Sequence, residues 1–376
     1  MNIKSALTLL TALSGLASLA SGDALNSFVQ TNLVSDLPGV AAQLDPNLVN
    51  PWGIVAGPTS PFWISDNGTG LSTLYDGTGA KLPLVVTIPP SGSAPTGVVF
   101  NGTTSFTGAP FIFATENGTI ASWSGGASAT TVVPATAGSV YKGLALGNNG
   151  SGDLLYAANF GLGRVDVFNS SFSSTSVSGG FKDTSLPAGY APFDIQNLNG
   201  KLYVTYALQD PAHHDDVAGL GHGFIDVFDF NGNMLQRLTS QGSLNSPWGL
   251  ALAPSGFGSF GGDLLVGNFG DGLIHAYNAS SGAFLGTLDD TSGNPLAIQG
   301  LWGLSFGNGA HSQGLNTLFF TAGIPGDGMV EDHGLYGAID QSPEPASAAL
   351  LICGLLAGVT LRLRRRASAK KLPTAR

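Results

Sequence analysis

The sequence predicts an all-β fold, a six-bladed β-propeller with four-stranded antiparallel blades. One short phrase recurs six times, and the residues at its fourth position are separated by 44, 46, 51, 55 and 54 residues. A repeat of about 40–55 residues without helical periodicity is typical of propellers, in which each repeat forms one blade. The six phrases are NPWGIVAG, APTGVVFN, VYKGLALG, APFDIQNL, SPWGLALA and GLWGLSFG.

Each phrase is followed by runs in which apolar and polar residues alternate, as they do in strands. Second strands are predicted at FWISD, FIFAT, LLYAAN, KLYVTY, DLLVGN and TLFFTA. Third strands follow at LSTLYD, TIASWS, RVDVFN, FIDVFD, LIHAYN and GLYGAID, and the fourth-strand patterns are weaker. The sixth repeat has no fourth strand, so we expect residues 27–36 to close the ring as the outermost strand of the last blade. A β-sandwich is the alternative, but it would not require six equivalent phrases.

The two ends of the chain differ from this body, which we place at residues 25–341. Residues 1–24 combine one positive charge with an apolar run and small residues, which predicts a secretory signal peptide cut after Ala20 or Ala24; a short buried helix is the alternative. Residues 346–361 are almost entirely apolar and just long enough for a transmembrane helix. A basic tail follows to residue 376, and its arginines would stay on the cytoplasmic side.

The C-terminal segment, residues 342–367, resembles a known sorting signal. It contains Pro343, Glu344 and Pro345, then the apolar run, then Arg364, Arg365 and Arg366. This order resembles the PEP-CTERM signal of Gram-negative bacteria. The resemblance implies an exosortase as processing partner, a transient anchor in the inner membrane, and a final location at the cell surface or outside the cell. An ordinary C-terminal membrane anchor is the alternative.

The composition of the body excludes some classes of function. Residues 25–341 contain 6 basic and 22 acidic residues, so a phosphate backbone would be repelled and nucleic-acid binding is not expected. Divalent cations would be attracted instead. The only cysteine, Cys353, lies in the apolar C-terminal run, so the body has neither disulfides nor thiolate chemistry.

Antiparallel blades bring particular turns to one face of a propeller. The phrases and the turns between second and third strands should share one mouth of the central channel. Those turns include DNGTG and NFGDG, in which the asparagines either form tight turns or offer ligands to the axis. Candidate binding residues from these turns and phrases are Asp66, Asn67, Glu116, Asn159, Asp194 and Asn268.

Two of these turns are expanded into polar insertions. Residues 209–222 contain three histidines, and residues 323–334 contain a fourth. Oxygen-rich loops in an acidic exported protein would suit Ca²⁺ better than Zn²⁺, although neither loop has a diagnostic metal-binding spacing. An ordered polar loop without a ligand and a transition-metal site are the alternatives. The candidate residues are Asp210, His213, His214, Asp215, Asp216, His222, Asp327, Glu331, Asp332 and His333.

Several stretches from about residue 33 to residue 340 resemble an uncharacterised bacterial family of exported proteins. They include NPWGIVAGPTSPFWISDNGTG and SPWGLALAPSGFGSFGGDLLVGNFGDG. The resemblance implies a propeller similar to NHL-repeat and gluconolactonase-like proteins, with no established activity.

The function expected from the sequence is a non-enzymatic module that binds an exopolysaccharide or another envelope component. Trp52, Trp248 and Trp302 either stack on sugars or, more in keeping with their position, pack between blades. A purely structural matrix protein is one alternative. Another is a metal-dependent hydrolase or lyase of the gluconolactonase or streptogramin-lyase type, with a histidine as proton carrier. We assign no catalytic residue, because the first strands offer one acid only, Asp194.

Overall fold

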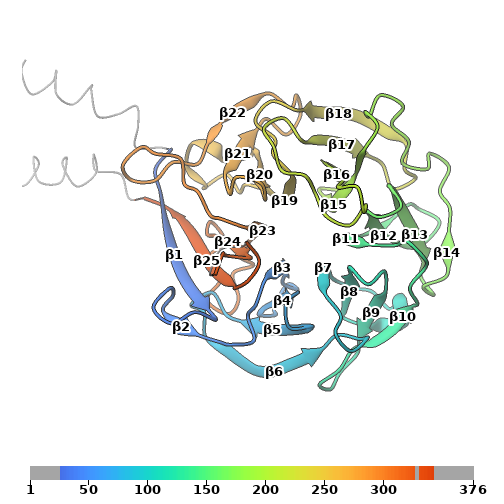
Figure 1. Ribbon diagram of the computed structural model, residues 1–376, viewed down its shortest axis with the longest axis horizontal. Coiled ribbons are helices and arrows are strands. Elements are labelled where there is room, and N and C mark those ends of the chain that lie inside the picture. The colour runs from blue at the N-terminus through green and yellow to red at the C-terminus, as the bar shows by residue number, and fades with distance from the viewer. Residues whose placement is uncertain (1–25, 327–329, 343–376) are drawn as a thin grey trace, which may run out of the picture.

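The computed structural model describes residues 26–326 and 330–342, and these residues form six β-sheets arranged as a ring (Figure 1). The predicted six-bladed propeller is confirmed. Within the described ranges, helical structure is limited to short 3₁₀ turns such as Phe106–Gly108 and Gly258–Phe260.

The blades follow one another along the chain, and each runs from its inner to its outer strand. Blade 1 contains β3 (Pro51–Val55), β4 (Phe62–Asp66), β5 (Leu71–Tyr75) and β6 (Lys81–Thr87). Blade 2 contains β7 (Pro95–Phe100), β8 (Phe111–Thr115), β9 (Ile120–Trp123) and β10 (Thr130–Val133). Blade 3 contains β11 (Tyr141–Asn148), β12 (Asp153–Asn159), β13 (Arg164–Asn169) and β14 (Ser174–Thr175). Blade 4 contains β15 (Tyr190–Leu198), β16 (Lys201–Leu208), β17 (Phe224–Phe228) and β18 (Met234–Ser240). Blade 5 contains β19 (Pro247–Leu252), β20 (Leu264–Asn268), β21 (Ile274–Tyr277) and β22 (Phe284–Thr287). Blade 6 contains β23 (Leu301–Phe306), β24 (Leu318–Ala322), β25 (Leu335–Gln341) and the two N-terminal strands β1 (Phe28–Ser35) and β2 (Gln43–Leu44).

The N-terminal strand closes the ring. β1 pairs antiparallel with β25, with Phe28 opposite Gln341 and Ser35 opposite Leu335, and the two strands lie side by side in Figure 1. This confirms that residues 27–36 close the last blade, although they form its fourth strand and not its outermost one. The short strand β2 adds a parallel edge to the same sheet, which the sequence analysis did not predict because two residues carry no periodicity. Pairing the two ends of the chain leaves the last blade without an open seam.

The recurring phrase shapes the inner strands at the axis. In all six blades the pairing of the first and second strands slips by one residue at the phrase, which is the signature of a β-bulge. In five of the six phrases a glycine at the fourth position then lets neighbouring inner strands approach closely, and Asp194 takes that position in blade 4. A Cβ on Gly53 would lie 2.5 Å from the carbonyl oxygen of Thr96, and one on Gly249 would lie 2.4 Å from that of Trp302.

Several expectations concern residues outside the described ranges. They are the signal peptide at 1–24, the apolar segment at 346–361, and the sorting-signal residues Pro343, Glu344, Pro345, Arg364, Arg365 and Arg366. Within residues 26–326 and 330–342, no helix has the length and apolar character needed to cross a membrane.

Candidate functional site

The axis of the propeller is filled by an aromatic floor, which we define as Trp52, Phe160, Phe193, Trp248, Phe269 and Trp302. Trp52 and Trp302 stack with their ring centroids 3.5 Å apart, and Trp248 meets both rings edge-on. These residues come from different blades, so they can touch only at the axis. Each of the three tryptophans is at most 2% exposed. They therefore pack in the channel and are not exposed for stacking on a sugar.

A single cation, Lys142, lies against this floor. Lys142 is the bulged residue of β11, and its ammonium sits 4.9 Å from the ring centroid of Trp52. It forms an ion pair with Glu116 and a second, at 3.5 Å, with Asp215. Burial alone would lower the pKa of Lys142, but the charge of Glu116 and its hydrogen bond raise it above its ordinary value. The side chain thus remains an ammonium at neutral pH although it is only 1% exposed.

Amide side chains extend the network across blade 1. Asn67 donates a hydrogen bond to Glu116 (2.9 Å), and Asn50 donates both to Asn67 (3.2 Å) and to Glu331 (3.0 Å). The indole N–H of Trp302 in turn donates to Asn50 (3.2 Å), which ties the network to the floor. We call Asn50, Asn67, Glu116, Lys142, His214, Asp215 and Glu331 the mouth cluster.

The insertion at residues 209–222 is folded so that two of its side chains reach the mouth cluster. The carboxylate of Asp210 accepts the backbone N–H groups of His214 (2.8 Å) and Asp215 (3.3 Å), which fixes the loop tip. His213 adopts a left-handed backbone conformation with φ of 59°, and this reverses the chain. Nδ1 of His214 then lies 2.8 Å from the carboxylate of Asp215. His222 bonds the carbonyl of Val217 (2.8 Å), so its contact closes the loop instead of facing the axis.

The second insertion contributes Glu331. Burial raises the pKa of Glu331 to about 7. The hydrogen bond from the amide of Asn50 lowers this pKa, and the nearby charge of Glu116 raises it further. Its neighbour His333 turns the other way and lies 2.6 Å from the carboxylate of Asp36, beside the closing strand. Asp332 is exposed and has no side-chain hydrogen bond or ion pair among the described residues, and Asp327 lies outside them.

A search against models of known protein families finds no match. Among curated proteins, the uncharacterized protein R648 of Acanthamoeba polyphaga mimivirus is 35% identical over 323 residues, covering 79% of this chain and 78% of its own. The uncharacterized protein L690 of the same virus is 33% identical over 329 residues, covering 82% and 84%. The chain belongs to the family of R648 and L690. The family therefore has viral members, whereas the sequence resemblance named bacterial ones.

Solved structures similar to this family member share the propeller fold only. A glucose dehydrogenase superposes with a TM-score of 0.51 at 12% identity, covering 84% of this chain and 100% of its own. A protein of unknown function from Bacteroides thetaiotaomicron gives 0.52 at 13% identity, covering 84% and 77%. Inactive virginiamycin B lyase from Staphylococcus aureus gives 0.48 at 12% identity, covering 84% and 99%.

Other candidate residues lie outside the mouth cluster. Asn159 and Asn268 are buried and bond backbone groups: Oδ1 of Asn159 accepts the N–H of Leu162 in its own turn, whereas the amide of Asn268 donates to the carbonyl of Ser243 in the connection between β18 and β19. Asp66 is fully buried at the end of β4, and burial raises its pKa well above the ordinary value. Asp194 lines a small axial cavity with residues of all six inner strands, and burial raises its pKa to about 8. These side chains act within the fold instead of at the mouth.

Two members of the mouth cluster were missed at the sequence level. Lys142 and Asn50 lie in two of the recurring phrases, VYKGLALG and NPWGIVAG, and neither was named as a candidate. The available signal for Lys142 was its place in VYKGLALG, since no other phrase has a charged residue at its third position. Asn50 carried no signal of its own, because its role depends on Glu331, which is 281 residues distant.

A resident divalent ion does not fit this cluster. Ligand atoms of Glu116, His214 and Asp215 lie within 4.8 Å of one another, and no other such group occurs among the described residues. However, the ammonium of Lys142 already forms ion pairs with both carboxylates. Ca²⁺ also prefers about six to eight oxygen ligands, and this group offers two carboxylates and an imidazole. The expectation of Ca²⁺ therefore gains no support from the geometry.

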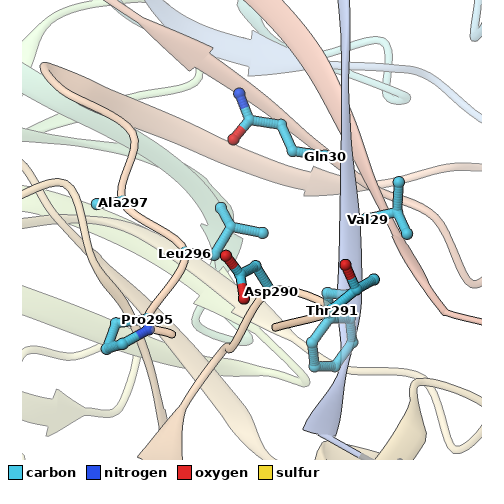
Figure 2. A pocket seen from close by; sticks show the side chains of 8 residues that line it. Val29, Gln30, Asp290, Thr291, Pro295, Leu296 and Ala297 are labelled. Atoms are coloured by element: carbon cyan, nitrogen blue, oxygen red, sulfur yellow. The ribbon is translucent and has the colours of Figure 1, made fainter. Parts of the chain in front are cut away.

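A pocket at the rim of the propeller is a weaker candidate for a ligand site than the mouth cluster. It lies beside β1, and Figure 2 shows Val29 and Gln30 on the strand with Asp290 and Thr291 of the loop that follows β22. The carboxylate of Asp290 accepts the backbone N–H groups of Ser292 (2.7 Å) and Asn294 (3.0 Å). This carboxylate is thus engaged by hydrogen bonds within its own turn, and the mouth cluster remains the best candidate site.

Proposed function

We propose that this chain is a non-enzymatic binding module whose ligand site is the mouth of the propeller axis. The observation that carries the proposal is convergence: polar side chains from five of the six blades meet at one point. Turns that only reversed the chain would have no reason to do so. The contributors are Asn50 and Asn67 from blade 1, Glu116 from blade 2, Lys142 from blade 3, His214 and Asp215 from blade 4 and Glu331 from blade 6.

Exposure at the mouth favours a binding role over a bare scaffold. The side chain of Asp215 is 69% exposed and that of His214 is 48% exposed, directly above buried Lys142. Polar groups held in place by a rigid fold but open to solvent are the usual composition of a binding site. Both long insertions send a side chain to the axis, which a spacer function would not require.

The proposal extends to where the protein acts. Residues 1–24 would direct export, and residues 342–367 would hold the chain in a membrane until an exosortase processed the tail. The ligand would then be an exopolysaccharide or another component of the cell envelope. The excess of acidic residues in the body supports a ligand other than nucleic acid.

Two measurements test this proposal. Mass spectrometry of the protein from its native cells should find a new N-terminus after Ala20 or Ala24 and a C-terminus near Pro343. A thermal-shift screen of the full chain against saccharides and envelope proteins should find a ligand whose effect is lost in Asp215→Asn/Glu331→Gln. The matched control is Asp340→Asn, an exposed carboxylate at the far end of β25. A ligand bound equally by the double variant would place the site elsewhere.

A metal-dependent hydrolase or lyase is the second candidate. The spacing of Glu116, His214 and Asp215 favours it, as does a carboxyl with a pKa of about 7 in the same cluster. The position of Lys142 opposes it, and no catalytic step is assigned. Metal analysis of purified protein and a thermal shift with Ca²⁺ or Zn²⁺ decide the matter: no metal and no shift would end this candidate.

A further inference from the structure

We infer that the ligand of the mouth is a peptide segment of a partner protein, presenting a lysine or arginine side chain flanked by apolar residues. This rests on the proposed function, because it takes the mouth as the binding site and names the chemistry that the site selects. Three features of the described residues support it: the charge of the mouth, an unsatisfied buried carboxylate, and the apolar residues around it.

The mouth has more carboxyl groups than its one cation can pair with. Glu116, Asp215 and Glu331 belong to the mouth cluster, and Asp216 lies close enough for the charge of Lys142 to act on it. Lys142 pairs with only two of these four carboxyl groups. A ligand that brings a second ammonium or a guanidinium would complement the remainder, whereas an anionic ligand would be repelled.

Asp216 supplies an independent observation. Its side chain is largely buried beside the mouth, where the hydroxyl of Ser246 is the side-chain group placed to hydrogen-bond it, and its Oδ2 has no partner at hydrogen-bond geometry. A buried carboxylate oxygen without a donor costs free energy, and a donor carried by a ligand would remove that cost. An ammonium or guanidinium group offers several N–H donors and no acceptor, so it matches this need better than a neutral hydroxyl group does.

Exposed apolar side chains occur on the loops of the same face. Leu220 is 78% exposed, Val330 44%, and Leu162 and Val217 37% each. They belong to the second-to-third-strand connections of blades 3, 4 and 6, so they flank the mouth on more than one side. Leu220 lies in the same insertion as Asp215. Apolar residues around a polar centre are typical of a surface that binds another protein.

A saccharide fits this surface less well. Sugar rings stack on exposed aromatic side chains, and the aromatic residues near the axis form the buried floor. The exposed residues at the mouth are carboxylates, a histidine and aliphatic side chains instead. Aliphatic side chains suit the leucine or valine of a peptide, and carboxylates suit its cationic residue.

The experiment uses fluorescence anisotropy with the full chain and labelled peptides of sequence Gly-Ser-Leu-Val-Lys-Leu-Val-Ser-Gly. Four matched peptides differ at one point: arginine, acetyl-lysine or glutamate replaces the lysine, or serine replaces the four apolar residues. We expect the lysine and arginine peptides to bind at least tenfold more tightly than the other three. Asp215→Asn should weaken the lysine peptide about tenfold, Leu220→Ser several-fold, and Asp340→Asn not at all. Raising NaCl from 50 to 500 mM should weaken it further.

The outcomes separate this inference from the proposed function. Equal binding of the lysine and acetyl-lysine peptides would overturn the inference, since charge would not matter. A saccharide that binds and is lost in Asp215→Asn/Glu331→Gln, with no peptide bound, would overturn the inference and leave the proposed function standing. If no peptide and no screened compound binds the folded protein, both fail. Circular dichroism and the thermal midpoint establish that each variant is folded.

Discussion

Replacing Lys142 with methionine removes the only positive charge of the mouth cluster while keeping most of the side-chain volume. Lys142 is 1% exposed and Glu116 is 13% exposed, so the variant would leave a largely buried carboxylate without its partner. Removing one partner of a buried ion pair costs about 3–5 kcal/mol. Asn67 still donates to Glu116 at 2.9 Å, so we expect the lower end, about 3 kcal/mol of unfolding free energy.

Urea denaturation followed by tryptophan fluorescence is a suitable assay, because three tryptophans belong to the aromatic floor that Lys142 contacts. The matched control is Lys201→Met, since Lys201 is exposed and makes no ion pair within the described residues. The control should change stability by less than about 0.5 kcal/mol. Lys142→Met/Glu116→Gln removes both charges and should recover at least half of the loss, because no unpaired carboxylate remains.

The same variant tests whether the ammonium takes the place of a metal ion. Without it, Glu116, His214 and Asp215 could bind a divalent ion, so 1 mM Ca²⁺ or Zn²⁺ should stabilise Lys142→Met and leave the wild type unchanged. The reasoning is refuted if Lys142→Met is as stable as the Lys201→Met control. It is equally refuted if the metal stabilises the wild type as much as the variant.

Three further predictions follow from the structure. The pKa of Glu331 is raised to about 7 from 4.5, so its stabilising effect is present below pH 4.5 and is lost as the pH rises toward 7. Glu331→Gln should therefore flatten the fall in unfolding free energy across that range by up to about 3 kcal/mol, whereas Asp340→Asn should not. Gly249→Ala would bring a Cβ to 2.4 Å from a backbone carbonyl oxygen, and urea denaturation should show a loss of about 1–3 kcal/mol. The control is Gly152→Ala, because a Cβ on Gly152 would have no atom within 4 Å and the change should be nearly neutral. If both variants lost the same unfolding free energy, the loss in Gly249→Ala would not come from the close packing of the inner strands. Phe28→Ala, at a residue 1% exposed in the closing strand, should cost about 3–5 kcal/mol in the same assay. Val29→Ala, at a residue 41% exposed, is its control, and similar losses would contradict the role given to the buried face of β1.

The architecture could be predicted because short-range sequence patterns specify it. A short phrase that contains Pro-Trp-Gly or a variant of it marks each inner strand, and alternating residues mark the strands that follow. The closing strand β1 was predictable because the sixth repeat lacks one strand and an unassigned strand precedes the first. Register and bulges were less accessible, since they depend on which residue pairs with which across a sheet.

The candidate site was only partly predictable, because residues of the same type have different contacts in the structure. The sequence predicted that His213 and His214 would lie on the mouth face, and of the two only His214 lies against Asp215. Asn67 joins the network, whereas Asn159 holds its own turn and Asn268 holds the connection between β18 and β19. A turn motif specifies a backbone conformation, and it does not say whether the side chain folds back or reaches the axis.

What the sequence determined by itself is therefore the number of blades, the face on which the insertions lie, and the acidity of the body. Those properties follow from periodicity, strand direction and composition, all of which are local or additive. What only the tertiary structure decided is that Lys142, buried on Trp52, draws Glu116 and Asp215 together at the axis. Ring closure brings side chains from blades 2, 3 and 4 within contact distance, and a contact between residues 73 positions apart leaves no pattern in a single sequence.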